Sequence, residues 1–414
     1  MSEPHDRRAA VTGIGVVAPN GTSTDTFWKA TQEGLSVLGP VTREGCEHLP
    51  LKVAGEVRDF DPGMTIEERF LVQTDRFTHF AMAAADFALD DARLGQAETS
   101  AEPYSIGVVT AAGSGGGAFG QRELQQLWGK GSRFVGPYQS IAWFYAASTG
   151  QISIRRKFKG PCSVVASDEA GGLDALAHAA RAVRRGTDVI VAGSTEAPLA
   201  PYSVVCQLGY EELSRETDPS RAYRPFTDTA CGFVPAEGGA MLVVEAERSA
   251  RERGVPVRAF VAGHAATFTG ASRWAESRDG LAQAVRQALD EAGCAPEEID
   301  VVFADALGVP EADRAEALAL ADALGAHGAR VPVTAPKAGT GRGYCAAPVL
   351  DTAAAVLAME HGVIPPTPNV VDVCHDLDLV TGRARVAALR TALVLSRGLM
   401  GSNSALVLRH GATQ

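Results

Sequence analysis

A strand that runs through a glycine-rich turn into a helix, between residues 160 and 183, constrains this chain most strongly. Residues 163–166 form a short β-branched run typical of a buried strand, and residues 173–183 are Ala-rich with helical periodicity. Ala170, Gly171 and Gly172 allow a tight turn between them. Such a unit exposes one side chain at the base of the helix, where backbone N–H groups and the helix dipole stabilise an anion. Enzymes place Ser or Cys there, whereas this chain has Glu169.

Strand-like and helix-like segments alternate along the chain. Strands are expected at residues 9–17, 106–110, 189–192 and 239–245, and residues 76–91 have the periodicity of an amphipathic helix. This alternation predicts an α/β fold with buried sheets.

The second part of the chain repeats features of the first. Residues 11–16 are echoed by 261–266, and residues 88–92 by 288–292. A second strand–turn–helix is expected between residues 331 and 359. Chance explains any single echo in an Ala- and Gly-rich sequence, but the shared order favours two duplicated halves. We place them at residues 1–250 and 251–414, with the junction in the charged stretch 249–257.

Composition narrows the class of protein. The hydrophobic content of 46% provides for a large core, and the net charge of -11 argues against nucleic-acid binding. Seven scattered cysteines without a C-x-x-C pair indicate a reduced, cytoplasmic protein without a zinc site or other metal site. Residues 1–8 are polar and lack the apolar core of a signal peptide, and no apolar run is long enough to span a membrane.

Three arginines, Arg181, Arg184 and Arg185, close the helix that follows Glu169. They form either a basic patch for an acidic carrier protein or solvated cations that stabilise the C-terminal end of the helix dipole.

Several motifs in sequence order resemble the β-ketoacyl synthases of the thiolase-like superfamily, over nearly the whole chain. They lie at residues 11–21, 224–226, 232–240 and 401–405. The resemblance implies a thiolase-like αβαβα layered sandwich. Such synthases use a Cys nucleophile, two His residues and a Lys.

The resemblance implies that the condensing residues are missing here. The Cys position falls on Glu169, the two His positions fall on Asp305 and Arg342, and Lys337 is retained; Glu316 matches an acid downstream of the first His. A carboxylate cannot become a thioester, Asp305 lacks a proton to donate at neutral pH, and an arginine remains charged. We therefore expect no independent condensing activity.

Residues 167–175 are similar to a run in the chain-length factors, or ketosynthase β subunits, of bacterial type II polyketide synthases, which carry Gln where this chain has Glu169. Residues 143–145, 149–154, 301–305 and 308–311 also resemble this group. The resemblance implies a non-catalytic subunit that pairs with a ketosynthase α subunit and shapes a tunnel for a polyketide delivered on an acyl carrier protein by phosphopantetheine. It implies no cofactor bound by this chain. A malonyl-carrier-protein decarboxylase and a homodimeric scaffold are the alternatives.

Glu169 has three interpretations: a cap on the helix N-terminus, a substitute for the family's Gln in decarboxylation, or a buried ion pair with Arg342 or Lys337. An ionised Glu only accepts hydrogen bonds, which weakens the second interpretation. Cys345 is expected to be a buried small hydrophobe.

Two further sets of residues are candidates for the tunnel and the subunit interface. The resemblance places the region of Gly116, Gly117 and Phe119 beside the tunnel, where Gly117 would leave volume open for a long chain. The alternative is that Gly117 serves only backbone geometry. Trp143, Phe144 and Tyr145 are expected at an interface or in the core.

Overall fold

A computed structural model of the chain describes residues 8–94, 103–270 and 277–411. The expectation of no signal peptide rests on residues 1–8, of which residues 1–7 lie outside the described residues. In the described ranges, no helix is both long and apolar enough to cross a membrane. All seven cysteines carry free thiols.

The main sheet has eleven strands, and its two sides repeat one arrangement. From the edge inwards, the first side has the order β5 (Cys162–Val165), β4 (Ile106–Ala111), β6 (Val189–Glu196), β7 (Gly238–Ala246), β1 (Ala9–Val17). The second side has the order β10 (Pro332–Thr334), β9 (Val301–Phe303), β14 (Thr391–Arg397), β15 (Ser402–His410), β8 (Ala259–Phe268), with β12 (Asp378–Leu379) added at its edge. When the five strands of each half are numbered in chain order, both sides have the same spatial order from the edge inwards: third, second, fourth, fifth, first. The parallel and antiparallel pairings of the two sides also correspond. β1 and β8 join the two sides through the pair Ala10 and Phe260.

The repeated sequence segments make equivalent helix–strand contacts in the two halves. A Cβ on Gly13 would lie 2.1 Å from the Ala88 carbonyl oxygen, and a Cβ on Gly263 would lie 2.2 Å from the Ala288 carbonyl oxygen. Glycine thus lets α3 (Arg76–Asp91) rest on β1 and α10 (Ser277–Ala292) rest on β8. The repeated strand order and this repeated contact agree with a duplicated fold, whereas the bounds 1–250 and 251–414 stay a prediction.

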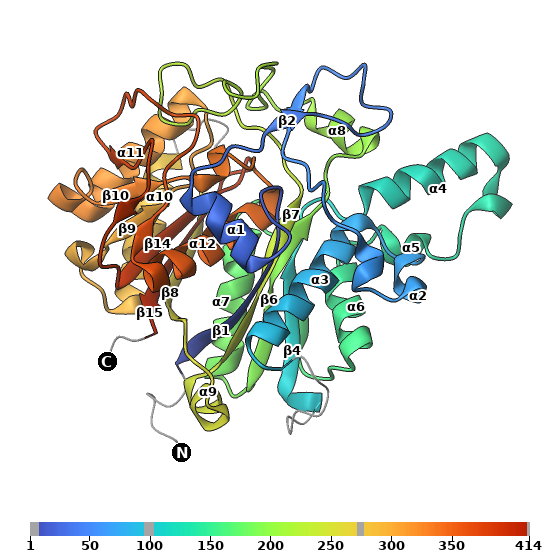
Figure 1. Cartoon of the computed structure of the whole chain (residues 1–414), viewed down its shortest axis with the longest axis horizontal. Helices are drawn as coiled ribbons and strands as arrows, with labels where there is room; N and C mark the ends of the chain where they lie inside the picture. Colours follow the sequence, from blue (N-terminus) through green and yellow to red (C-terminus); the bar gives the residue numbers. More distant parts are fainter. Residues whose placement is uncertain (1–7, 95–102, 271–276, 412–414) are drawn as a thin grey trace.

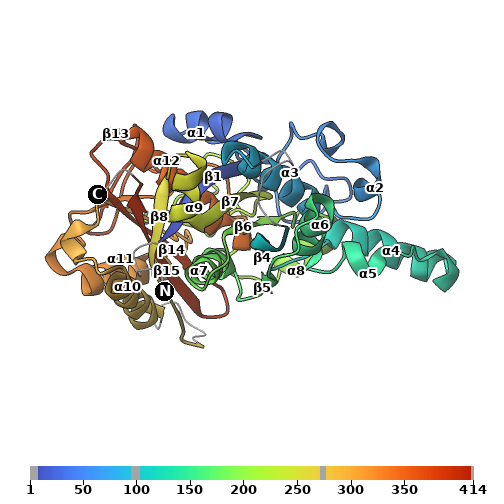
Figure 2. The ribbon, with the colours of Figure 1, turned by 90° about the horizontal axis from the view of Figure 1, so that it is seen from below.

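The helices complete the layers of the sandwich (Figures 1 and 2). α7 (Gly171–Arg184) and α12 (Ala347–His361) contact strands of both halves, so they form the middle layer. α3 and α6 (Ala147–Arg156) cover the outer face of the first half, and α10 and α11 (Pro310–Leu324) cover that of the second. The α/β, thiolase-like layered architecture predicted from the sequence is confirmed.

One segment projects from this body in both views, namely α4 (Gly117–Lys130) with α5 (Gln139–Ala142) (Figures 1 and 2). We refer to residues 117–145 as the α4–α5 arm. α8 (Pro201–Gln207) packs against α4 where the arm leaves the body. The remaining short elements are α1 (Thr24–Gln32), α2 (Glu68–Leu71), α9 (Glu247–Arg253), β2 (Gly39–Pro40), β3 (Val53–Ala54), β11 (Val363–Ile364) and β13 (Arg385–Val386).

The predicted bounds of β1 and α3 match the structure, and β5 begins and ends one residue earlier than predicted. The turn predicted at 170–172 is wrong in part, because α7 already begins at Gly171. Glycine at position 172 allows α7 to pack closely against the neighbouring segment. A Cβ there would lie 2.2 Å from the Cys345 carbonyl oxygen, just before the facing helix α12 begins.

Candidate functional site

The sequence-predicted site residues lie at the carboxyl ends of parallel strands. β4, β5 and β6 are mutually parallel, as are β9, β10 and β14. Glu169 follows β5, Asp305 follows β9, and Lys337 and Arg342 follow β10. The carboxyl ends of the strands in both halves thus bring these four residues together, with the N-termini of α7 and α12 beside them.

The turn before α7 holds Glu169 in place. Asp168 has a φ of 58°, in the left-handed region, and its Oδ2 accepts a hydrogen bond from the Met400 backbone N–H at 2.8 Å. Glu169 is 3% exposed, and Arg342 Nη2 donates to its Oε2 at 3.2 Å. Oε1 has no hydrogen-bond partner among the described residues, and Ala170, the N-cap of α7, lacks a side-chain cap. The structure therefore favours the ion pair over the capping interpretation.

A chain of buried charges extends from Glu169 into the second half. Arg342 Nη1 donates to Asp305 Oδ1 at 2.8 Å. Arg397, the last residue of β14, donates from Nε to Asp305 Oδ2 at 3.2 Å and from Nη2 to Glu316 Oε2 at 3.0 Å. Each guanidinium thus bridges two carboxylates, which is the arrangement that a buried charge requires.

Lys337 belongs to the same cluster but does not contact Glu169. Its Nζ lies 2.6 Å from Asp351 Oδ2 on α12 and donates to the carbonyl oxygens of Ala304 and Asp305 at 2.8 and 3.1 Å. Of the two cations that the sequence suggested as partners of Glu169, the structure pairs Arg342 with it.

The acids of the cluster differ in their electrostatics. Burial raises the pKa of Glu169 to about 7, although Arg342 opposes the shift. Burial also acts to raise the pKa of Asp305, but Arg342, Arg397 and Lys337 outweigh it and hold this pKa below its usual value. Asp351, buried beside Lys337, has a pKa raised to about 6. Burial thus favours the protonated forms of Glu169, Asp351 and Glu316, whereas the neighbouring cations favour the ionised form of Asp305.

Glu169 lies in the wall of a cavity of about 380 Å³. The cavity reaches from the turn at Asp168 and Glu169 to α8 and the first residues of the α4–α5 arm. Its lining is rich in small, aromatic and hydroxyl-bearing side chains: Ala112, Gly113, Ser114, Gly117, Trp143, Ala166, Pro198, Tyr202, Ser203, Cys206, Gln207, Tyr210, Tyr344 and Cys345.

The three residues expected beside a tunnel have different environments. Gly117 lines the cavity, and a Cβ there would lie 2.1 Å from Ser203 Oγ on α8. Gly116 is required by backbone packing, since its Cβ would lie 2.0 Å from the Ala142 carbonyl oxygen. Phe119 is buried beneath Arg122 and is not among the residues that line the cavity.

The aromatic run expected at an interface or in the core is on the surface. Trp143 is 53% exposed, and Phe144 and Tyr145 are each 41% exposed, with their rings packed together. Other apolar side chains of the α4–α5 arm are also exposed, among them Leu124, Trp128, Phe134 and Tyr138.

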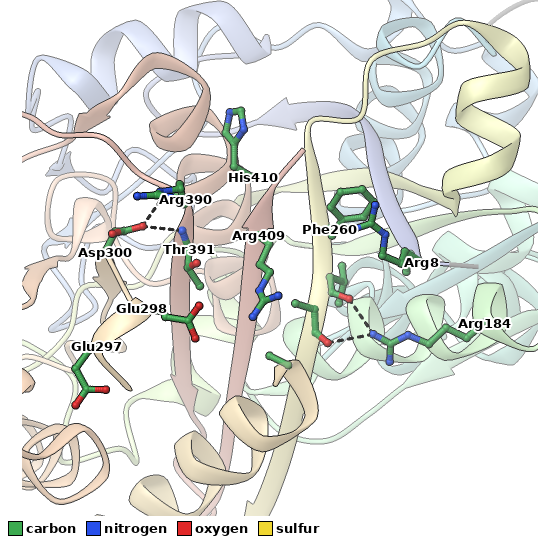
Figure 3. A pocket seen from close by; sticks show the side chains of 14 residues that line it. Arg8, Arg184, Phe260, Glu297, Glu298, Asp300, Arg390, Thr391, Arg409 and His410 are labelled. Carbon is green, nitrogen blue, oxygen red and sulfur yellow. Dashed lines mark hydrogen bonds between the residues drawn. The ribbon is translucent and has the colours of Figure 1, made fainter. Parts of the chain in front are cut away.

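The three arginines at the end of α7 lie far from Glu169. α7 has 14 residues and is therefore about 20 Å long, and Glu169 is at its other end. Arg184 donates to Glu291 at 2.7 Å and to the carbonyl oxygens of Val261 and Ala262 on β8, at the edge of a second cavity of about 660 Å³ (Figure 3). Arg181 and Arg185 are exposed.

Sequence reasoning missed two members of the charge cluster, Arg397 and Asp351. Each is a charged residue in an otherwise apolar element, at the end of β14 and within α12, respectively. Such a position is the sequence feature from which both residues could have been predicted, because a buried charge needs a partner of opposite charge. In the described ranges, no group of three or more His, Cys, Asp or Glu side chains is arranged to hold a metal ion.

The duplicated halves and the charge-filled site at their junction define a thiolase-like protein. Residues 6–250 match the family described as "Beta-ketoacyl synthase, N-terminal domain", and residues 258–371 match "Beta-ketoacyl synthase, C-terminal domain". The chain belongs to the beta-ketoacyl synthase family.

Its relatives include polyketide synthase subunits of streptomycetes. The chain is 78% identical to the "Putative polyketide beta-ketoacyl synthase 2" of Streptomyces coelicolor, over 98% of this chain and 96% of that protein. It is 50% identical to the "Tetracenomycin polyketide synthase ketoacyl synthase beta subunit" of Streptomyces glaucescens, over 97% of this chain and 98% of that protein. Among solved structures, "The ishigamide ketosynthase/chain length factor" superposes with a TM-score of 0.88 at 29% identity, over 98% of this chain and 99% of that chain. These relatives confirm the resemblance to ketosynthase β subunits.

Proposed function

We propose that this chain is the non-condensing, chain-length-determining subunit of a type II polyketide synthase. The observation that carries the proposal is the side chain at the strand–turn–helix, where a nucleophile would stand. Glu169 is buried there and held by Arg342, which also holds Asp305. A carboxylate so paired forms no thioester, and neither Asp305 nor Arg342 supplies an imidazole.

The partner in this proposal is a ketosynthase α subunit that carries the Cys and His residues. Two features of the surface support it. The α4–α5 arm exposes apolar side chains, led by Trp128 at 82% and Trp143 at 53%. β5 is an edge strand and is partly exposed, so its outer side is free for further pairing within the described part of the chain. The solved ketosynthase/chain length factor supports the same pairing by likeness.

The cavity beside Glu169 is, in this proposal, this chain's share of a tunnel that receives the growing polyketide. The acyl chain would arrive on an acyl carrier protein through phosphopantetheine, as the solved complex of a type II polyketide synthase acyl carrier protein with its ketosynthase suggests by likeness. This chain would bind no cofactor of its own. Its seven free thiols support a cytoplasmic location.

Reconstitution tests the proposal. The purified chain is mixed with malonyl-carrier protein, alone and together with a type II ketosynthase α subunit. We expect a polyketide only from the mixture, and co-purification of the two chains. Elongation by the isolated chain would refute the proposal.

One observation supports a second function, the decarboxylation of malonyl-carrier protein to supply starter units. Glu169 Oε1 has no described hydrogen-bond partner, and burial raises the pKa of this carboxyl to about 7. Its protonated form could donate a hydrogen bond to a developing enolate, which an ionised carboxylate cannot do. Carbon dioxide release by the isolated chain, abolished in Glu169→Ala, would support this function.

A homodimeric scaffold is the remaining alternative, since the exposed arm would also fit a second copy. The molar mass of the chain expressed alone and with the ketosynthase separates the two assemblies. A stable homodimer that does not exchange into a heterodimer would favour the scaffold.

A further inference from the structure

A buried carboxyl outside the charge cluster lies directly behind the cavity. Glu196 is the last residue of β6 and is fully buried. No cation in the described part of the chain forms an ion pair with it, and burial raises its pKa to about 7. Burying a carboxyl without a cationic partner costs free energy of folding. The groups that donate hydrogen bonds to this carboxyl therefore indicate its structural role.

Those hydrogen bonds fix the loop between β4 and α4. Glu196 Oε1 accepts from the Gly113 backbone N–H at 2.5 Å, and Oε2 accepts from Ser114 Oγ at 2.5 Å and from the Ser114 backbone N–H at 3.4 Å. The next residue, Gly115, has a φ of 62°, and α4 then begins without a side-chain cap. The carboxyl thus accepts from two backbone donors of the loop. The loop is also held by hydrogen bonds from Ala112 N–H to the Val165 carbonyl oxygen at 3.3 Å and from Gly116 N–H to the Trp143 carbonyl oxygen at 3.1 Å.

The loop is a wall of the cavity. Ala112, Gly113, Ser114 and Gly117 all line it, and Gly117 starts the α4–α5 arm. A shift of Gly113 and Ser114 would therefore move Gly117 relative to Ser203 on the opposite wall.

Glu196 also lies near the Glu169 turn, on the other side of Gly113 from Cys345. The Cys345 thiol donates to the Asp168 carbonyl oxygen at 2.9 Å, and burial together with the nearby charge of Glu196 raises the pKa of this thiol. Gly113 is packed near both groups: its Cβ would lie 3.4 Å from Glu196 Oε1 and 3.5 Å from Cys345 Sγ. One carboxyl therefore holds the loop wall and lies close to the thiol beneath the turn.

We propose that Glu196 is a positioning residue that fixes the wall formed by residues 112–117 and thereby sets the length of acyl chain that the cavity accepts. The inference rests on the proposed tunnel function and adds to it the residue that holds the tunnel wall in place. Glu196 acts through the loop and does not itself line the cavity.

The test compares Glu196→Ala, Glu196→Gln and Ser114→Ala in the complex with the ketosynthase. Ser114→Ala changes an exposed side chain, so its folding is secure. Amide exchange of residues 113 and 114 is measured by mass spectrometry, and product lengths are measured with malonyl-carrier protein. Glu196→Ala should accelerate the exchange by at least about tenfold and broaden the product lengths, since the variant loses three hydrogen bonds to the loop and a single one is worth about that factor. Glu196→Gln retains an acceptor for the Gly113 N–H and offers a donor to Ser114 Oγ, but it leaves the Ser114 N–H without its acceptor, so it should restore part of both properties.

Glu245→Gln is the matched control. Glu245 is also fully buried, on the neighbouring strand β7 and opposite Val189, at the other end of the β6–β7 pair from Glu196. It should leave both the loop exchange and the product lengths unchanged.

Unchanged exchange in Glu196→Ala and Ser114→Ala would overturn the inference. A second result would also overturn it, namely faster exchange in Glu196→Ala without a change in product lengths, while Gly117→Phe shortens the product in the same assay. In that case the tunnel function would stand and the role of Glu196 would be refuted. If Gly117→Phe also has no effect, the tunnel function fails and the inference falls with it.

Discussion

Glu169 and Arg342 occupy corresponding places in the two halves of the chain and form an ion pair, with 3.2 Å between Oε2 and Nη2. Glu169 stands between β5 and α7, and Arg342 stands between β10 and α12, the equivalent strand and helix of the second half. An ion pair thus joins the two halves where they meet, and each half supplies the partner that the buried charge of the other half needs.

Removing Arg342 should strongly destabilise the protein. Arg342→Ala leaves Glu169 and one side of Asp305 without their cation in a buried site, so we expect the free energy of unfolding to fall by about 3–5 kcal/mol. Urea denaturation measures the loss. Arg385→Ala is the control, because Arg385 forms its pair with Asp378 at the surface, and it should cost less than about 1 kcal/mol. Equal losses in the two variants would contradict the role of the buried pair.

Stability should depend on pH through Glu169. Its folded-state pKa of about 7 exceeds the usual glutamate pKa of 4.5, so between these values the folded protein retains a proton that the unfolded chain releases. The free energy of unfolding therefore decreases as pH rises through this window and levels off above pH 7. Glu169→Gln removes the effect, so its stability relative to the original chain should increase by about 2–3 kcal/mol between pH 5 and pH 8. Denaturation curves of both proteins at each pH measure this difference, and a constant difference would argue against the raised pKa.

Much of the fold was predictable because local signals agreed with the global arrangement. The matching sequences around Gly13 and Gly263 reflect one packing requirement, the close approach of a helix backbone to a strand, met twice. The strands predicted in the first half from apolar runs bounded by turns also agree with the observed strands to within about four residues.

Most members of the charge cluster and one of its pairings, Glu169 with Arg342, were predictable, but Arg397, Asp351 and the other pairings were not. The acidic partner of Lys337 depends on the direction of the short turn after β10. Lys337 pairs with Asp351, which lies within the Ala-rich helix α12 and was not predicted to belong to the site. Arg397 lies 92 residues from Asp305 in sequence, and only the parallel pairing of β14 with β9 brings them together. Contacts of this kind follow from topology, which no local pattern contains.

The exposed α4–α5 arm should bind the ketosynthase. Trp128→Glu places a charge on the most exposed aromatic ring of the arm and should reduce co-purification at least tenfold, as expected for a large aromatic side chain at an interface. Val386→Glu is the control, because Val386 is equally exposed but lies on β13, outside the arm. Undiminished co-purification of Trp128→Glu, with both variants folded by circular dichroism, would exclude the tip of the arm from the interface.

Filling the cavity at Gly117 should shorten the product. A Cβ at this position would lie 2.1 Å from Ser203 Oγ, so the Ser203 side chain must shift, and the added phenyl ring reduces the space that the cavity of about 380 Å³ leaves for an acyl chain. We expect Gly117→Phe, in complex with the ketosynthase, to release polyketides shorter by at least one malonyl unit, as measured by mass spectrometry. Gly129→Phe lies on the same helix, where nothing within 4 Å of its Cβ opposes a side chain, and should leave product length unchanged while the complex persists. If both variants give the original length, this cavity does not set the length of the acyl chain, and Gly117 serves only the packing of α4 against α8.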